Sequence, residues 1–281
     1  CLTSIFGSLS LGLLIEADYA ARQRRELTAH YLALAGAEAA FHELLADAQG
    51  VDSLADSWHA GPLMRGKLGA GDFAVGYVSE ADGQPMSGVV DEERKLNVNK
   101  AESAMLRELP GMTKETADAI VALRIDRPLR SIEEIANLPG FDTDFLSRQR
   151  PGAPAGLAAF LTVHGDGRVN VNTAPQQLLQ CLEMLDSERA DRLIRRRNGP
   201  DGVPGTRDDT PFTSLKEVQQ HLDMSDAVFA KLQPWLAVAS THFTVDSAGH
   251  VPGRPPVVRK VHYVVRRDDK GLAVLRVERP R

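Results

Sequence analysis

The strongest constraint on how this chain of 281 residues folds is an internal repeat. Residues Lys95–Ala101 (KLNVNKA) return as Arg168–Ala174 (RVNVNTA), at an offset of 73 (168 − 95). A segment that is repeated in this way forms the same local structure twice. We therefore expect two copies of one helical unit, over about 95–146 and 168–236.

The second copy differs from the first by an insertion. Arg124 aligns with Arg197 at the offset of 73, whereas Ser131 aligns with Ser214 at an offset of 83, so ten residues have been added between them. The insert lies within Asn198–Thr210 (NGPDGVPGTRDDT), which is rich in glycine and acidic residues. This difference between the copies is the main clue to function.

The insert has the chemistry of a loop that binds a hard cation. Ca²⁺ takes six to eight oxygen ligands from carboxylates and backbone carbonyls in flexible loops. The candidate ligands are Asn198, Asp201, Val203, Asp208 and Asp209. Asp91 and Glu92 are the nearest candidates for further ligands by composition. The spacing is not that of an EF-hand, and a solvated polar turn is the alternative. The sequence thus predicts a calcium site here and leaves that alternative open.

The repeated phrase itself is expected to start helices. Asn99 and Asn172 are placed to act as N-caps, whose side chains accept bonds from first-turn amides. Capping boxes are expected at Ser131 with Glu134 and at Ser214 with Glu217. Helices are expected over about 100–109, 114–124, 131–137, 175–184, 187–197, 214–221 and 225–236.

The N-terminal part predicts one long helix. Residues 16–48 are rich in Ala, Leu, Glu and Arg and contain no proline. Residues 1–15 are uncharged but shorter than the ~20 apolar residues that span a bilayer, so they form either a buried helix or the end of a membrane helix. The Arg22–Arg25 cluster fits a juxtamembrane position and a solvated helix face equally well. The expected apolar stripe comprises Leu27, Tyr31, Leu34, Ala35, Phe41 and Leu45.

Strand patterns flank the helical repeats on both sides. They cover 72–79 and 89–90 before the repeats, and 241–246, 257–266 and 272–277 after them. A small sheet packed on the N-terminal helix, with the helical unit inserted into it, is the economical arrangement. The expected limits are 1–48 for the helix, 49–90 with 240–281 for the sheet, and 91–239 for the inserted helical domain.

Composition and motifs argue against nucleic-acid binding and catalysis. The net charge is −5 and aromatic residues make up 5%, so neither a basic field nor a stacking surface is expected. Leu109–Ile120 (LPGMTKETADAI) resembles the helix-hairpin-helix of DNA-binding proteins, but a structural helical hairpin is favoured. Arg195–Arg197 is expected to neutralise the acidic insert. No metalloprotease, nucleophile-elbow or P-loop motif occurs, and Cys181 among leucines predicts a buried thiol.

Taken together, these segments resemble the protein K family of minor pseudopilins of the type II secretion system. The resemblance lies in the apolar start that continues into the helix of residues 16–45, and in the motifs DEERKLNVN (91–99), LPG (109–111), ADAI (117–120), GRVNVNTAP (167–175) and DGVPGTRDDTPF (201–212). It implies an α+β, pilin-like fold in which a long N-terminal helix packs on an antiparallel sheet and a duplicated all-α domain is inserted into that sheet. It also implies bound calcium.

The same resemblance implies a place and partners. The chain is expected in the bacterial inner membrane through its N-terminal helix, with its body in the periplasm, and in a tip complex with minor pseudopilins I and J (and H). The family's leader and cleavage site cannot be assigned to residues of this chain. The alternatives are a helix-hairpin-helix DNA-binding module and a minor pilin of a type IV pilus.

Overall fold

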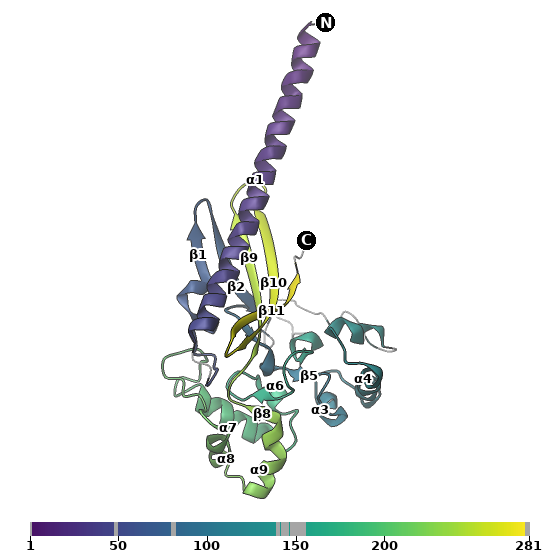
Figure 1. Cartoon of the computed structure of the whole chain (residues 1–281), viewed down its shortest axis with the longest axis vertical. Coiled ribbons are helices and arrows are strands. Elements are labelled where there is room, and N and C mark those ends of the chain that lie inside the picture. The colour runs from purple at the N-terminus through teal and green to yellow at the C-terminus, as the bar shows by residue number, and fades with distance from the viewer. Residues whose placement is uncertain are drawn as a thin grey trace.

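A long helix, a sheet and a group of short helices make up the molecule (Figure 1). This computed structural model describes residues 2–47, 50–79, 83–138, 141, 146 and 156–278. Helix α1 (Leu2–Ala46) lies along the sheet and projects beyond it at the N-terminal end. The short helices gather at the opposite end of the molecule. Among the described residues, no helix is both long and apolar enough to span a membrane.

The described strands form a seven-stranded antiparallel sheet, with two short two-stranded ladders elsewhere. The order along the sheet is β1-β2-β9-β10-β11, with β3 beside β2 and β4 beside β9. The bounds are β1 Arg65–Leu68, β2 Gly71–Val78, β3 Pro85–Ser87, β4 Val90–Asp91, β9 His242–Val251, β10 Val257–Asp268 and β11 Gly271–Glu278. Strands from both flanks of the helical repeats thus pair in one sheet, and the predicted fold class is confirmed.

Two of these strands do not follow from the sequence pattern. The sequence pattern predicted no strand at 65–68 or at 85–87. β1 carries Arg65, Gly66 and Lys67, and β3 begins with Pro85, so neither has strand propensity of its own. Both form because β2 offers an open ladder on either side.

Helix α1 packs on the sheet through its small residues. Ala29, Ala33 and Gly36 face β9, which presents Ser247 and Gly249. A Cβ on Gly249 would lie 2.0 Å from the carbonyl oxygen of Ala29, and one on Gly36 would lie 2.3 Å from Ser247 Oγ. The helix therefore approaches the strand more closely than larger side chains allow.

The apolar stripe predicted on α1 was only partly right: Leu34 and Phe41 pack against the core, but the other large residues of the stripe do not. Leu27, Tyr31 and Leu45 are more than half exposed, whereas Leu32 and Leu44 are buried with the alanines. Spacing alone favoured the large residues, but close helix–sheet contact selects the face with the smallest side chains.

The helices of the inserted part agree with the predictions best where they are longest. α4 (Lys114–Asp126) and α7 (Ser187–Arg197) match the expected 114–124 and 187–197. The predictions for 100–109 and 175–184 were too long, because α3 covers Ser103–Arg107 and α6 Gln176–Leu179. The other helical segments are α2 Ser57–Ala60, α8 Leu215–His221, α9 Asp226–Leu232, and the 3₁₀ turns η1 Pro62–Met64, η2 Glu92–Arg94, η3 Ile132–Asn137, η4 Leu157–Ala159 and η5 Gln233–Trp235.

The duplication is visible in the structure as two equivalent closures. In the first copy β5 (Leu96–Asn97) pairs in parallel with β6 (Leu161–Thr162). In the second copy β7 (Val169–Asn170) pairs in parallel with β8 (Leu236–Ala237). Each copy therefore begins and ends on a two-residue ladder. A single continuous apolar core joins the two copies, from Leu96 to Leu236.

Asn99 and Asn172 do not cap helices, so that prediction was wrong. The N-caps of α3 and α6 are Glu102 and Pro175. The Asn99 amide instead accepts a bond from Leu129 N (2.8 Å) and donates one to Leu129 O (3.0 Å). Three residues separate each asparagine from the first residue of its helix, which leaves the side chain free to pair with a distant backbone.

Asn172 makes the same two bonds in the second copy. Its side chain accepts from Phe212 N (2.8 Å) and donates to Phe212 O (3.0 Å). Arg124 and Arg197 are also equivalent, since they donate to the carbonyl oxygens of Val98 and Val171. The repeated residues therefore bind the start of each copy to the segment that follows its long helix, α4 or α7.

The predicted capping boxes differ in detail. Ser131 N donates to Glu134 Oε1 at 3.3 Å, so the first box is confirmed. In the second, Ser214 Oγ accepts from Glu217 N (3.3 Å), but the Glu217 carboxylate accepts from Thr213 N (2.8 Å) rather than from the cap residue. One half of the second box therefore forms as predicted.

Candidate functional site

The acidic insert forms a loop that folds back on itself between α7 and α8. Gly199, Gly202 and Gly205 all have positive φ, at +67°, +70° and +83°. A Cβ on Gly199 would lie 2.2 Å from the carbonyl oxygen of Asp208, so only glycine permits this close return of the chain. Thr210 N closes the loop on Arg197 O at 2.8 Å.

The three carboxylates of the loop bind its own backbone amides. Asp201 Oδ1 accepts from Val203 N (2.7 Å), Asp208 Oδ2 from Asp201 N (3.1 Å) and Asp209 Oδ2 from Gly205 N (2.7 Å). The pKa of Asp208 is held below its usual value, chiefly by the Thr206 hydroxyl and the Asp201 amide. The loop is thus organised around its three carboxylate side chains.

Three oxygen atoms of the loop converge on the hydroxyl of Thr206. Thr206 Oγ1 lies 2.6 Å from Asp208 Oδ1, 3.2 Å from Val203 O and 3.4 Å from Asp209 Oδ1. One hydroxyl carries a single proton and can satisfy only one of these acceptors at a time. The excess of electron-rich oxygens around one point is the chemistry that a hard cation matches.

Asn198 and Arg197 form the buried side of the loop. Asn198 Nδ2 donates to Gly202 O (3.2 Å), and its Oδ1 accepts from Arg197 Nε (3.4 Å). Burial, reinforced by Arg94, lowers the pKa of Arg197 to about 9, against the opposing effect of Asp209. Arg197 is therefore a buried cation beside the loop rather than a solvated one.

The other arginines of this run do not neutralise the insert as expected. Arg195 forms its ion pair with Asp191, one turn earlier on α7. The Arg196 guanidinium lies over the Phe212 ring, 4.8 Å from its centroid. Only Arg197 faces the loop, because the helix turns its two neighbours to other sides.

The structure places the five predicted residues in one loop, but the carboxylate oxygens of Asp201, Asp208 and Asp209 do not all lie within 4.8 Å of one another, and the two further candidates lie elsewhere. Asp91 belongs to the junction between the sheet and the helical domain, where its Oδ2 accepts from Asn170 Nδ2 (3.2 Å), Thr173 Oγ1 (2.5 Å) and Ser240 Oγ (2.7 Å). Glu92 is salt-bridged to Lys95 in the same junction. The suggestion that these two residues complete the loop's ligand set was therefore wrong, because β4 carries Asp91 and the turn η2 carries Glu92 into the junction instead.

This junction is a buried polar network. Burial and the neighbouring Glu93 raise the pKa of Asp91 well above its usual range. Burial also acts on Glu92, but Lys95 outweighs it and the pKa of Glu92 falls to about 2. Buried groups of this kind need complete hydrogen bonding, so the network holds the two parts of the molecule in one arrangement.

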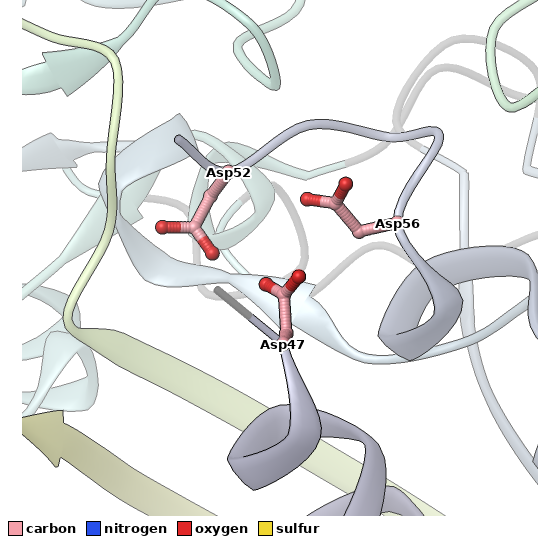
Figure 2. A group of neighbouring side chains, drawn as sticks. All are labelled: Asp47, Asp52 and Asp56. Atoms are coloured by element: carbon pink, nitrogen blue, oxygen red, sulfur yellow. The ribbon is translucent and has the colours of Figure 1, made fainter. Parts of the chain in front are cut away.

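A second acidic group was not predicted from the sequence. Asp47, Asp52 and Asp56, at the end of α1 and in the connection that follows, have carboxylate oxygens within 4.8 Å of one another (Figure 2). Among the described residues, no other acidic, His or Cys side chains cluster this tightly. Their spacing of five and four residues matches no metal motif, so no local signal marked them.

Arg267 of β10 already supplies positive charge to this group. Its guanidinium pairs with Asp47 Oδ2 (3.0 Å) and with Asp52, and it also donates to Leu44 O (3.2 Å). Burial raises the pKa of Asp52 to about 6, against the opposing effect of Arg267. The cluster therefore works as an ion-paired joint that fixes the end of α1 to the sheet.

The described side chains show no activated nucleophile among the residues singled out from the sequence. Cys181 is buried, as predicted, and burial raises the pKa of its thiol to about 12. A thiol that stays protonated is a poor nucleophile.

Comparison with known proteins gives two family matches. Residues 169–239 match the family Type II secretion system (T2SS), protein K, and residues 91–151 match the helix-hairpin-helix motif. The first match covers the second copy of the repeat together with its acidic loop. The second covers the first copy of the repeat.

The fold has a close counterpart among solved structures. A chain from the crystal structure of the GspK-GspI-GspJ complex of the enterotoxigenic Escherichia coli Type 2 Secretion System superposes with a TM-score of 0.65. The superposition covers 94% of this chain and 99% of that one, at 14% sequence identity. At this identity the likeness shows the shared fold.

Two curated relatives match a shorter stretch. They are the Endonuclease/exonuclease/phosphatase family domain-containing protein 1 of Bos taurus (29% identical over 129 residues) and of Homo sapiens (28% over 129 residues). The match covers 43% of this chain and spans 22% of the length of each relative.

The chain shares with that chain of the GspK complex a long helix on an antiparallel sheet that is interrupted by a helical domain. Its match to protein K, together with the fold shared with the GspK complex, supports a GspK-type minor pseudopilin.

Proposed function

We propose that this chain is a structural minor pseudopilin at the tip of the type II secretion pseudopilus, with a role in protein secretion across the outer membrane. The position of the helical domain carries this proposal. The domain lies at the end of the molecule opposite the N-terminus of α1 (Figure 1). In a filament of parallel α1 helices, a further subunit stacked beyond this end would collide with the domain. The subunit therefore fits only at the end of the filament.

Its partners in this role are minor pseudopilins I and J (and H). The structurally similar chain belongs to a complex of GspK with GspI and GspJ. The N-terminal helix would sit in the inner membrane and the body in the periplasm, as in the family that the sequence resembles. The function is one of assembly, without an enzymatic step.

A helix-hairpin-helix DNA-binding role is not favoured. Residues 91–151 match that motif, but the copies share one apolar core, which gives the helical hairpins a structural task. The net charge of −5 also provides no field toward phosphates. Filter binding of duplex DNA at low salt tests the alternative, and tight binding that weakens with salt would favour it over the pseudopilin. The other alternative, a minor pilin of a type IV pilus, would belong to a different assembly. The genes next to the one that encodes this chain would show whether they encode secretion components or pilus components.

Genetic complementation tests the proposal in a bacterium that has a type II secretion system and lacks its own protein K. The full-length gene is expected to restore export of the system's substrates and to co-purify with pseudopilins I and J. Normal membrane insertion with neither export nor co-purification would refute the proposed role.

We also propose that the acidic loop binds Ca²⁺ through Asp201, Asp208, Asp209, the Val203 carbonyl and the Asn198 side chain. The three oxygens around the Thr206 hydroxyl support this proposal. Calcium bound there would replace hydrogen bonds to Thr206 with ion contacts and would clamp the loop beside α7.

Thermal unfolding of the full chain with chelator and with added Ca²⁺ tests the metal. A ligand present at 100 times its Kd stabilises the folded state by about 2.7 kcal/mol, which is easily measured. The variant Asp208→Asn is expected to lose this shift, whereas Asp56→Asn, in the other acidic group, is expected to keep it. A melting temperature that does not respond to calcium would leave the loop as a polar turn.

A further inference from the structure

The two edges of the sheet are protected very differently. β1, at one edge, has four residues, two of them the charged Arg65 and Lys67. Short, charged edge strands resist pairing with other chains. β11, at the other edge, has eight residues and, among the described residues, pairs with β10 alone. No strand in the described part of the chain pairs with its outer row of backbone amides and carbonyls.

β11 also exposes apolar side chains, which is unusual for an unpaired edge. Val274, Leu275 and Val277 are each nearly half exposed. The charged residues Arg276 and Glu278 form an ion pair with each other along the strand. The strand thus lacks the unpaired lysines, the prolines and the shortness that protect natural edges.

The register assigns these side chains to opposite faces. Val277 is opposite Tyr263, whose ring packs edge-on against Phe41 of α1 at 5.3 Å, so Val277 lies on the α1 face of the sheet. Arg276 is opposite Val264, on the other face. A strand added here would meet apolar groups on the α1 face and a charged pair on the other.

We propose that the outer edge of β11 is a docking site for a β-strand of a different pilin-like subunit, which extends the sheet by strand addition. This inference rests on the proposed function, and it names the surface by which the chain would meet its partners. The added strand would alternate apolar residues, toward Val277 and Val274, with polar ones, toward Arg276 and Glu278. Main-chain hydrogen bonds give affinity in this mode, and alternate side chains give specificity.

A second copy of this chain is a poorer occupant. A two-fold axis that pairs β11 with itself in an antiparallel ladder also reverses α1. The two α1 N-termini would then point in opposite directions, whereas pseudopilin helices held in one membrane run the same way. A different subunit has no such symmetry and can present its strand with the helices parallel.

The test measures binding of the full chain to minor pseudopilins I and J of the same secretion system. The variant carrying Val274→Lys and Val277→Lys is expected to bind the partner at least 10-fold more weakly, because charges at an edge oppose strand addition. The control Val228→Lys makes the same type of change at one exposed valine on α9 and is expected to bind like the wild type. In the wild-type complex, amide hydrogen exchange is expected to slow along 271–278.

The outcomes separate the edge from the function. If the wild type binds I or J and the lysine variant binds equally well, with β11 amides unprotected, the docking site is refuted while the pseudopilin role stands. If the folded wild type binds neither partner, the proposed function itself fails. If the wild type alone dimerises and the lysine variant does not, the occupant is a second copy and the assignment to a different subunit is wrong. Circular dichroism confirms that each variant is folded.

Discussion

Asn99 and Asn172 make the same pair of hydrogen bonds in two environments that differ in burial. The contribution of this pair to stability can therefore be measured twice in one chain. Asn172→Ala removes the bonds to both the N–H and the C=O of Phe212, a residue with 0% exposure. Leaving a buried donor or acceptor without a partner costs about 1–3 kcal/mol. Two such groups, partly relaxed, predict a loss of about 3–4 kcal/mol in the free energy of unfolding.

Asn99→Ala removes the same two bonds at Leu129. Asn99 is only half-buried, so water can reach the groups it leaves and replace part of the bonding. We expect a loss of about 1–2 kcal/mol, and therefore a difference of about 2 kcal/mol between the equivalent variants.

Urea unfolding followed by far-UV circular dichroism measures both losses in the same chain. Since one core joins the copies, they are expected to unfold together, and the midpoints can be compared directly when the slopes agree. Equal losses would show that burial does not determine how much these two hydrogen bonds contribute to stability. A larger loss for Asn99→Ala than for Asn172→Ala would refute the reasoning.

Three further predictions concern other parts of the fold. Burial raises the pKa of Asp52 to about 6. The contribution of Asp52 to the free energy of unfolding is therefore complete below about pH 4 and is lost as the pH rises to about 6. The free energy of unfolding of Asp52→Asn, measured across this range, should lack that decline. Gly249→Ala should lower stability by about 2–3 kcal/mol, because its Cβ would meet a backbone oxygen of α1 at 2.0 Å, whereas Gly50→Ala, with nothing within 4 Å, should change it little in the same thermal melts. Met184 has a φ of +76° where the first copy has Gly111 at +71°. Met184→Gly should therefore be neutral or stabilising by up to about 1 kcal/mol, while Gly111→Ala should destabilise the fold by about 1–2 kcal/mol. A loss of stability in both variants would contradict this prediction.

Local patterns predicted the elements that depend on local energy. α4 and α7 begin at side-chain caps, Thr113 and Asp186, and run for several turns, so periodicity and capping were sufficient to find them. α3 and α6 are short segments between tight turns, and their ends are set by packing rather than propensity. β1 and β3 exist only as partners of β2.

The acidic loop could be predicted from local sequence, whereas the second acidic group could not. Asp201, Asp208 and Asp209 lie close in sequence within a glycine-rich loop, so the sequence placed them together. In the second acidic group, Asp47 and Asp52 are joined by Arg267, which comes from a strand more than 200 residues later. No local sequence pattern predicts such a contact.

By itself the sequence determined that one helical unit occurs twice, that an acidic loop distinguishes the copies, and that strands flank them. These features follow from short-range periodicity and from similarity along the chain. The tertiary structure decided what the repeated residues do. Asn99 and Asn172 pair with backbone groups 30 and 40 residues away, and the face of α1 that meets the sheet is built from alanines together with Leu32 and Leu44, while Leu27, Tyr31 and Leu45 stay exposed. Both outcomes depend on how closely distant segments approach, which is fixed only when the whole chain has packed.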